Sequence, residues 1–267
     1  MLDAKTHAAL ARELHEAERS RVPVGQFSKR YPGLTVADSY AIQRAWIDIK
    51  RGEGQAIIGH KIGLTSRAMQ VAAQIDEPDY GTLLEAMLVG NGSELEAAGY
   101  LVPRLEVEFA FVLARPLRGP GTTLAEVMSA TDCVVPALEL IDARIERFDR
   151  VTRAPRTVLD TIADNAANAA LVLGDQRMKP GAVDWRWAGA LLIRNGVVEE
   201  SGLGAAVLNH PGNGVAWLAN KLAAWGEGLA AGEVVLGGSF TAPVPCAAGD
   251  EFLADYGPLG SISLRFR

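Results

Sequence analysis

The sequence predicts an α+β protein with a curled, mixed β-sheet core. Helical patterns fill the first 55 residues, whereas positions 56–267 consist mainly of short apolar runs separated by glycine-rich breaks. These runs do not alternate regularly with long helices, which argues against a doubly wound parallel sheet. We therefore expect a helical N-terminal subdomain over 1–55 and a β-roll or barrel-like domain over 56–267.

Composition excludes several classes of partner. The chain has 267 residues, about half of them hydrophobic, and a net charge of −6, which argues against nucleic acid or an anionic membrane as the partner. No apolar run reaches membrane-spanning length and no secretory signal is visible, so we expect a cytoplasmic location. Cys133 and Cys246 lie in apolar runs, which is typical of buried free thiols.

Helices are expected first. Residues 4–20 have a helical pattern with Leu10 and Leu14 on the apolar side. Thr35 followed by Asp38 resembles a capping box and predicts a second helix that ends near Gly52. A strand over 56–64, a short helix capped by Thr65 or Ser66, a turn-rich loop over 76–81 and a strand over 82–89 follow.

The run Arg104–Leu113 predicts a strand, because it alternates with period two and is rich in β-branched and aromatic residues. One face is apolar and belongs to the core. The other carries Glu106 and Glu108 and then turns apolar, so the two carboxylates do not continue into a solvated face. Residues 132–141 predict a second strand, with Glu139 in the middle of an apolar run, and glutamate is almost never buried without a partner.

The remaining elements are short. A helical pattern mixed with polar residues covers 157–169, strands are expected over 170–173, 188–193, 234–241, 250–255 and 261–266, and a helix capped by Asn213 is expected to reach Trp225.

Three glutamates form a candidate metal site. Neighbours on one strand face lie roughly 7 Å apart, and two carboxylates at that distance in a partly dry setting repel, so one must protonate unless a cation sits between them. Glu106, Glu108 and Glu139 offer oxygen ligands suited to Mg²⁺ or Mn²⁺, whereas no Cys/His set suggests zinc. The alternative for the first two is a polar strip at the rim of a sheet.

Other candidate residues lie in glycine-flanked or loop segments. Lys61, between Gly59 and Gly63, is either a partly buried acid–base group whose pKa is lowered near a metal or an edge-strand lysine. Asp79 either assists Lys61 or forms a turn. His60 is either a proton shuttle or a structural residue.

The glycine-rich run at 237–241 is a further candidate. Ser239 and Thr241, with backbone N–H groups, either hold a substrate carboxylate or form a plain turn. Asp164 and Asn168 share a helical face and are either partners behind the site or a solvated side.

Several of these motifs, taken in order, resemble the hydratase/decarboxylase branch of the fumarylacetoacetate hydrolase superfamily. They run over essentially the whole chain: Gly59-His60-Lys61-Ile62-Gly63-Leu64-Thr65-Ser66, Glu77-Pro78-Asp79-Tyr80-Gly81, Pro103-Arg104-Leu105-Glu106-Val107-Glu108, Pro136-Ala137-Leu138-Glu139-Leu140-Ile141-Asp142, Asp164-Asn165-Ala166-Ala167-Asn168 and Gly237-Gly238-Ser239-Phe240-Thr241.

The resemblance implies the family's curled β-roll and a Mg²⁺ or Mn²⁺ ion held by Glu106, Glu108 and Glu139. It also implies a homo-oligomer, often a pentamer or decamer. Lys61 and Asp79 are then the expected proton-transfer residues. Ser239, Thr241, His60 and Leu64 are the expected substrate-binding residues.

The implied activity is metal-dependent addition of water to a 2-oxo-4-enoate, specifically a seven-carbon diacid, during the breakdown of aromatic compounds. Alternatives are decarboxylation of a 2-oxo-3-ene diacid, hydration of 2-oxopent-4-enoate, hydrolysis of an acylpyruvate, or a non-catalytic partner subunit. A diacid needs a second cationic group, for which Arg67, Arg104 and Arg144 are candidates.

Overall fold

The computed structural model describes residues 1–267. The helices are α1 (Ala4–Ser20), α2 (Phe27–Arg30), α3 (Val36–Gly52), α4 (Arg67–Ala73), α5 (Leu124–Ala130), α6 (Val158–Ala163) and α7 (Pro211–Ala223). The strands are β1 (Ile57–Gly63), β2 (Asp79–Leu84), β3 (Leu88–Val89), β4 (Glu94–Leu95), β5 (Arg104–Leu113), β6 (Thr131–Ile141), β7 (Asn168–Leu173), β8 (Gly189–Arg194), β9 (Val197–Leu203), β10 (Val234–Leu236), β11 (Val244–Pro245), β12 (Glu251–Asp255) and β13 (Ser261–Phe266).

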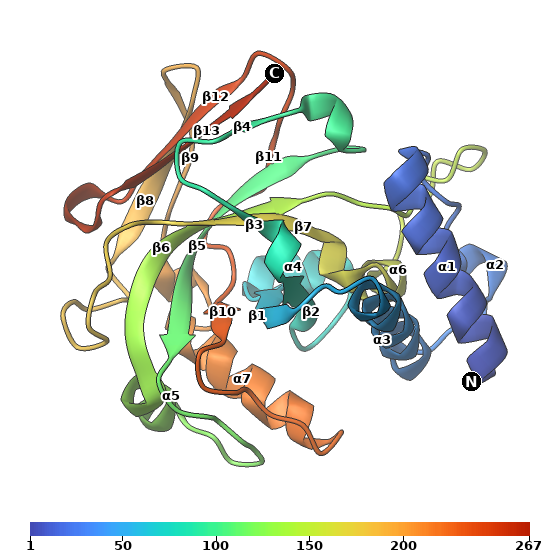
Figure 1. Ribbon diagram of the computed structural model, residues 1–267, viewed down its shortest axis with the longest axis horizontal. Helices are drawn as coiled ribbons and strands as arrows, with labels where there is room; N and C mark the ends of the chain where they lie inside the picture. Colours follow the sequence, from blue (N-terminus) through green and yellow to red (C-terminus); the bar gives the residue numbers. More distant parts are fainter.

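Two mixed sheets form the core. The larger has the order β2-β1-β10-β5-β6-β7-β3, and β11 also pairs with β5. The smaller has the order β4-β13-β12-β8-β9. Most pairs are antiparallel, but β1 with β10, β3 with β7 and β4 with β13 are parallel. Figure 1 shows the long strands β5 and β6 curving through the centre of the molecule. The prediction of a curled mixed sheet is confirmed.

The N-terminal helices cover one side of the large sheet. In Figure 1, α1, α2, α3 and α6 gather at the right, beside β1 and β2. Thr35 and Asp38 form the expected capping box at the start of α3. Leu10 and Trp46, both at most 1% exposed, pack in one cluster with side chains of the sheet such as Leu236. Burying each such side chain contributes about 1.5–3 kcal/mol, so helices and sheet stabilise one another.

A second core fills the space between the two sheets. Phe109 on β5 lies 5.2 Å from Trp185, 5.1 Å from Phe240 and 5.7 Å from Tyr256, measured between ring centroids. The Tyr256 hydroxyl donates to the carbonyl oxygens of Ala137, at 2.5 Å, and of Glu108, at 3.2 Å. The smaller sheet thereby fixes the central part of β5 and β6 from their apolar face.

Three expectations about elements were wrong. Asp79 does not lie in a loop but starts β2, where it is 1% exposed. Helix α7 starts two residues before Asn213, because Pro211 fits the first helical turn and the His210 ring accepts from the Gly212 N–H. The run at 234–241 is a strand only to Leu236, since Gly238 has a positive φ and turns the chain away.

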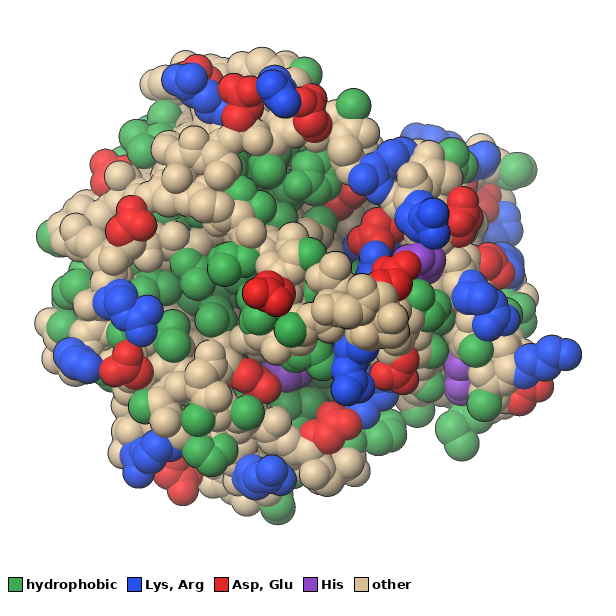
Figure 2. Space-filling model, viewed as in Figure 1, with side chains coloured by type: hydrophobic (Ala, Val, Ile, Leu, Met, Phe, Trp, Pro, Cys, Tyr) green, Lys and Arg blue, Asp and Glu red, His purple; other side chains and the backbone are tan.

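The surface is mixed in character. Figure 2 shows hydrophobic side chains gathered in a hollow on the left of the view, with lysine, arginine, aspartate and glutamate side chains scattered around it. No helix is both long enough and apolar enough to cross a membrane.

Candidate metal centre

Strands β5 and β6 bring three glutamates together. Glu106 pairs directly with Glu139 across the antiparallel ladder, and Glu108 follows Glu106 on the same face. One carboxylate oxygen from each lies within 4.8 Å of the other two. The opposite face of β5 carries Leu105, Val107, Phe109 and Phe111, which are 0–1% exposed. Alternation along the strand therefore points the carboxylates away from the aromatic core between the two sheets.

These carboxylates lie in a poorly solvated place. Glu139 is 0% exposed and Glu108 is 1% exposed, while Glu106 is half-buried. Burial, with the neighbouring Glu139 charge, raises the pKa of Glu106 to about 7. The same two causes raise the pKa of Glu108 well above its ordinary value. Three negative charges in this space repel one another, and a cation among them would relieve that repulsion.

Lys61 supplies one positive charge at the edge of the cluster. Its Nζ atom lies 3.2 Å from Glu139 Oε1 and donates to the Ala166 carbonyl oxygen at 3.1 Å. The side chain is buried. Burial opposes its charge, but the carboxylates of Glu139, Asp79 and the two β5 glutamates outweigh this and raise the pKa of Lys61. The carboxylates around the lysine thus favour its charged form, and the lowered pKa expected beside a bound metal ion stays a prediction.

A left-handed turn holds the other side of the cluster. Asn165, Ala166 and Ala167 have φ values of 52°, 49° and 58°, a conformation that residues other than glycine adopt singly and at a cost. The turn directs the Ala166 carbonyl to Lys61. Asn168, the first residue after the turn, donates from Nδ2 to Glu139 Oε1 at 2.8 Å. The strained turn therefore orients both neighbours of Glu139.

Two glycines leave room for the polar groups. The Gly238 N–H donates to Glu108 Oε2 at 2.9 Å. A Cβ at Gly238 would lie 2.5 Å from the Thr65 side chain, and φ is 117° there, so only glycine fits without strain. A Cβ at Gly63 would lie 2.2 Å from Asp79 Oδ1. Glycine at 63 thus gives the Asp79 carboxylate its place.

The donor set fits a hard divalent cation. Glu108 Oε1, Glu139 Oε2 and Asn168 Oδ1 are buried and have no hydrogen-bond partner in the protein. Buried polar atoms without partners are rare and usually mark a site for an ion or water. All the converging side chains offer oxygen, which suits Mg²⁺ or Mn²⁺ better than zinc. Glu106, Glu108 and Glu139 are the residues that would hold the ion.

Asp79 lies beside this cluster, and His60 does not. Asp79 on β2 pairs with Gly63 on β1, which places its side chain near Lys61. Both of its carboxylate oxygens are buried and lack a hydrogen-bond partner. Burial raises the pKa of Asp79, although Lys61 opposes the rise. His60 projects from the opposite face of β1, where its Nδ1 lies 3.3 Å from Glu233 Oε2.

The other predicted contact residues have partners within the protein. Ser239 Oγ lies 2.9 Å from the Thr241 carbonyl oxygen and 3.3 Å from that of Val107. The Val107 N–H donates to Thr241 Oγ1 at 3.3 Å. Both hydroxyls therefore fasten the loop after β10 to the strand that carries Glu106 and Glu108. Leu64, just after β1, has a φ of 54° and its carbonyl accepts from Gln70.

Arg144 and Asp164 form a buried ion pair behind the left-handed turn. The Arg144 guanidinium bonds the Asp164 carboxylate, and its Nη2 donates to the carbonyl oxygens of Asp164 and Asn168 at 2.9 and 3.0 Å. In the sequence, the only indication that Asp164 supports the site is the polar run 164–168, in which Asp164 and Asn168 are four residues apart, as on one face of a helix. The structure ends α6 before that run.

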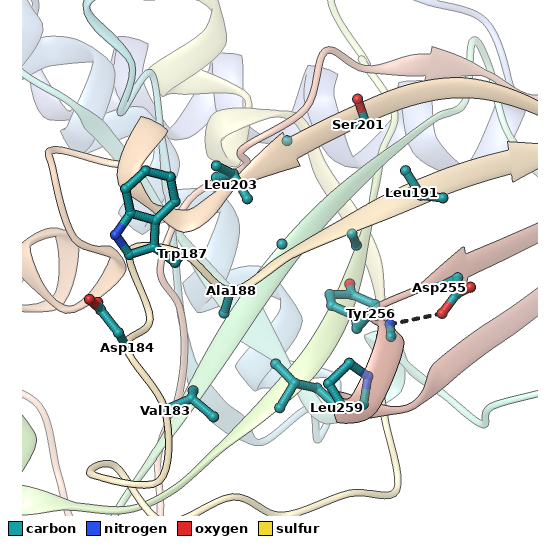
Figure 3. A pocket seen from close by; sticks show the side chains of 15 residues that line it. Val183, Asp184, Trp187, Ala188, Leu191, Ser201, Leu203, Asp255, Tyr256 and Leu259 are labelled. Carbon is teal, nitrogen blue, oxygen red and sulfur yellow. Dashed lines mark hydrogen bonds between the residues drawn. The ribbon is translucent and has the colours of Figure 1, made fainter.

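A large hollow lies elsewhere, and none of the three clustered glutamates lines it. It has a volume of about 680 Å³ and is bounded by β8, β9 and the turn after β12. Figure 3 shows Trp187, Leu191, Leu203 and Leu259 around it, with the Asp255 carboxylate bonded to a backbone N–H. No lysine or arginine lines it, so it lacks the cations that an acidic ligand needs.

Comparison with known proteins decides the family. The chain is 56% identical over 266 residues, the full length of both chains, to the 2-oxo-hept-4-ene-1,7-dioate hydratase of Escherichia coli. It belongs to the family branch of hydratases and decarboxylases that includes this enzyme. No protein-family model matches the chain.

Other members of this branch are also similar over the whole chain. The 2-hydroxyhexa-2,4-dienoate hydratase of Comamonas testosteroni is 38% identical over 100% of this chain and 99% of its own. The 4-oxalocrotonate decarboxylase of Pseudomonas putida G7, solved with magnesium and adipate, superposes with a TM-score of 0.95 and is 36% identical, covering 100% of this chain and 99% of its own.

More distant structures share the fold alone. A fumarylacetoacetate hydrolase family protein from Yersinia pestis CO92 has a TM-score of 0.57 at 14% identity and covers 78% of this chain and 92% of its own. A fumarylpyruvate hydrolase from Pseudomonas aeruginosa, solved with Mn²⁺ and pyruvate, has a TM-score of 0.59 at 15% identity and covers 78% of this chain and 88% of its own.

Proposed function

We propose that this protein is a metal-dependent hydratase that adds water to 2-oxohept-4-ene-1,7-dioate and forms 4-hydroxy-2-oxoheptanedioate. The observation that carries the proposal is the 56% identity over the full length to the E. coli hydratase, against 38% for a hexadienoate hydratase and 37% for a 4-oxalocrotonate decarboxylase. The proposed setting is the meta-cleavage breakdown of homoprotocatechuate.

The carboxylate cluster supports this chemistry. A divalent cation held by Glu106, Glu108 and Glu139 would bind the C1 carboxylate and C2 oxygen of a 2-oxo acid and stabilise negative charge on the C2 oxygen. Asn168 and the Gly238 N–H fix the orientation of two of these ligands. Tyr256 holds the strands that carry them from the opposite face. The protein thus presents the ligands in a preset arrangement.

Lys61 and Asp79 are the proposed proton-transfer residues. The surrounding carboxylates keep Lys61 protonated, so it acts first as a donor, toward C5 of the dienol tautomer of the substrate. Asp79 has two unpartnered oxygens and a raised pKa, which suits a base that takes a proton from the water adding at C4. The two side chains both border Gly63, so they face the same space.

Four further residues complete the proposed substrate contacts. Ser239 and Thr241 border the strand between Glu106 and Glu108, close to the expected place of the C1 carboxylate. Leu64 is proposed as an apolar contact next to Gly63. His60 belongs to the same proposal, although its ring faces Glu233; it would act through the backbone of β1.

A second candidate is decarboxylation of a 4-oxalocrotonate-type diacid. The observation in its favour is that this chain superposes with a TM-score of 0.95 on a 4-oxalocrotonate decarboxylase that was solved with magnesium and adipate. Adipate is a diacid. Hydration of the five-carbon 2-oxopent-4-enoate is a further alternative, since a hydratase of that name in Burkholderia vietnamiensis is 35% identical.

One assay separates these functions. Purified protein with Mg²⁺ is offered each acid, while CO₂ release and the appearance of a 4-hydroxy-2-oxo acid are followed. We expect the hydroxylated seven-carbon diacid without CO₂. Turnover confined to CO₂ release from the six-carbon diacid would replace the hydratase proposal with the decarboxylase, and turnover confined to the five-carbon acid would replace it with the short-chain hydratase.

We also propose that the chain forms a homo-oligomer, with a pentamer or decamer as the expected size, in the cytoplasm. Trp187 is 71% exposed at the edge of the hollow in Figure 3, and Leu191 and Leu203 are 41% and 42% exposed. Apolar surface of this kind is often covered between subunits. Light scattering on the purified protein measures the size, and a monomer at micromolar concentration would contradict the proposal.

A further inference from the structure

A second, smaller pocket lies beside the carboxylate cluster. Its volume is about 410 Å³, and Arg104, Arg147 and Arg156 line it together with apolar side chains such as Ile141 and Met69. The three arginines come from distant parts of the chain: Arg104 starts β5, while Arg147 and Arg156 lie on the long connection between β6 and α6. The Arg156 N–H donates to the Arg147 carbonyl oxygen at 2.9 Å, which holds these two positions side by side.

The register of β5 and β6 places this pocket next to the cluster. Arg104 pairs with Ile141, and the adjacent same-face pair is Glu106 with Glu139. Same-face neighbours along a strand lie about 7 Å apart. Ala167, which also lines the pocket, follows the residue whose carbonyl oxygen accepts from Lys61. A ligand at the carboxylates can therefore extend along this face into the pocket.

The arginines carry charge that the protein does not neutralise. None of the three forms an ion pair, and the side-chain bond of Arg156 is to the Ile145 carbonyl oxygen, at 3.3 Å. Burial lowers the pKa of Arg156, the nearby charges of Asp164 and Asp160 oppose this, and those of Arg144 and Arg147 add to it.

The carboxylates in the pocket wall are already engaged. Asp142 accepts from the backbone N–H groups of Leu101 and Val102 at 2.8 and 2.6 Å. Glu146 pairs with Arg150. Free positive charge therefore remains in the pocket, and an anion is the ligand that suits it.

We propose that Arg104, Arg147 and Arg156 bind the distal carboxylate of a dicarboxylic 2-oxo acid and so select diacids over monoacids. This rests on the proposed function, because it assumes that the 2-oxo acid end of the substrate lies at the carboxylate cluster. An extended seven-carbon chain separates its terminal carbons by roughly 7.5 Å, close to the same-face step of about 7 Å along β5 that separates Glu106 from Arg104. Guanidinium groups bind carboxylates with paired hydrogen bonds, which adds directional selectivity.

Two of the three arginines that the sequence offered for the second carboxylate do not line this pocket. Arg144 is 3% exposed and is occupied by Asp164. Arg67 is exposed at the start of α4 and does not line the pocket. Of those three candidates only Arg104 lines the pocket, together with Arg147 and Arg156 from the connection after β6.

The test compares a diacid with a monoacid. Wild type, Arg156→Met and Arg147→Gln are assayed with Mg²⁺ on 2-hydroxyhepta-2,4-diene-1,7-dioate and on 2-hydroxypenta-2,4-dienoate. Arg153→Gln is the matched control, because Arg153 lies exposed on the same connection and outside the pocket. Loss of a charged hydrogen bond predicts that the diacid-to-monoacid ratio of kcat/KM falls roughly 10- to 100-fold in Arg156→Met, mainly through a higher KM for the diacid.

A binding measurement separates the two levels of the proposal. Calorimetry with Mg²⁺ compares 2-oxoheptanedioate with 2-oxopentanoate, neither of which is turned over. A wild-type preference for the diacid that is lost in Arg156→Met and reduced in Arg147→Gln supports the subsite. A preference that both variants keep would overturn the subsite while leaving the hydratase proposal intact. A wild-type protein that neither binds nor converts either acid would contradict the proposed function itself. Arg147→Gln changes an exposed side chain, so the fold is not at risk in that variant.

Discussion

Lys61 Nζ lies 3.2 Å from Glu139 Oε1, and both side chains are buried. Their strands are not neighbours, because β10 and β5 lie between β1 and β6 in the sheet. The contact arises because β10 ends at Leu236 and the chain turns away at Gly238, which leaves Lys61 free to reach across. The curled sheet and one glycine turn thus bring a cation to three carboxylates.

Replacing Lys61 with Met should abolish most activity. The methionine keeps the length of the side chain but can neither donate a proton nor balance Glu139. General acid–base groups typically contribute 10²- to 10⁴-fold, so we expect kcat to fall by at least about 100-fold. Steady-state kinetics with saturating Mg²⁺ measure this, with Lys179→Met as an exposed control. Wild-type turnover in Lys61→Met would remove the lysine from the mechanism.

Replacing Arg144 with Met should destabilise the fold. The substitution leaves the buried Asp164 carboxylate unpaired and frees the carbonyl oxygens of the 164–168 turn. Breaking a buried pair in this way costs about 3–5 kcal/mol in the free energy of unfolding. Urea denaturation monitored by circular dichroism tests the expectation.

The control for that experiment is an exposed ion pair. Arg265 and Glu251 are 62% and 61% exposed, so Arg265→Met should cost no more than about 1 kcal/mol. Equal losses in the two variants would show that the Arg144 pair adds no stability beyond a surface contact.

Acid should weaken the attachment of α3 and the N-terminus. Asp38 accepts from the Leu2 N–H, Thr35 and His7, and despite its burial these bonds lower the pKa of its carboxyl. Because the folded pKa lies below the unfolded value of about 3.9, the stabilisation is fully present above that pH and is lost progressively as the pH falls from there through the folded pKa. Asp38→Asn should therefore be less stable than wild type by about 0.5–2 kcal/mol at pH 6.

Below pH 4 that difference should shrink, because Asp38 of the unfolded wild-type chain takes up a proton that folded Asp38 does not, which costs the folded state its advantage. Thermal unfolding of both proteins between pH 3 and 7 provides the measurement. A gap between the two proteins that stays constant across this range would refute the assigned role of the Asp38 charge.

The sequence was sufficient for the strands that carry the ligands. Period-two alternation predicts β5 with its observed bounds, 104–113, and separates the Glu106 face from the apolar face. Glu139 stands out as one charge in an apolar run on β6. Alternation is a local property, which is why it is visible in the sequence.

Other parts of the site depend on contacts between distant segments. Three consecutive left-handed residues at 165–167 contradict ordinary preferences, so the local pattern favours a helix there. Arg147 and Arg156 lie on a connection whose pattern does not indicate which residues approach β5. Asp79 has the neighbours of a turn residue, and only its pairing with Gly63 makes it part of a strand.

Binding of a divalent cation tests the central claim most directly. Calorimetry with Mg²⁺, or electron paramagnetic resonance with Mn²⁺, is carried out on wild type and on Glu108→Gln, with the exposed Glu251→Gln as control. We predict one ion per chain in wild type and control, and an affinity at least about tenfold lower in Glu108→Gln, since even groups that only orient metal ligands are worth 10- to 100-fold. A folded Glu108→Gln protein that binds the ion as tightly as wild type would contradict the assignment of Glu106, Glu108 and Glu139 as the metal ligands.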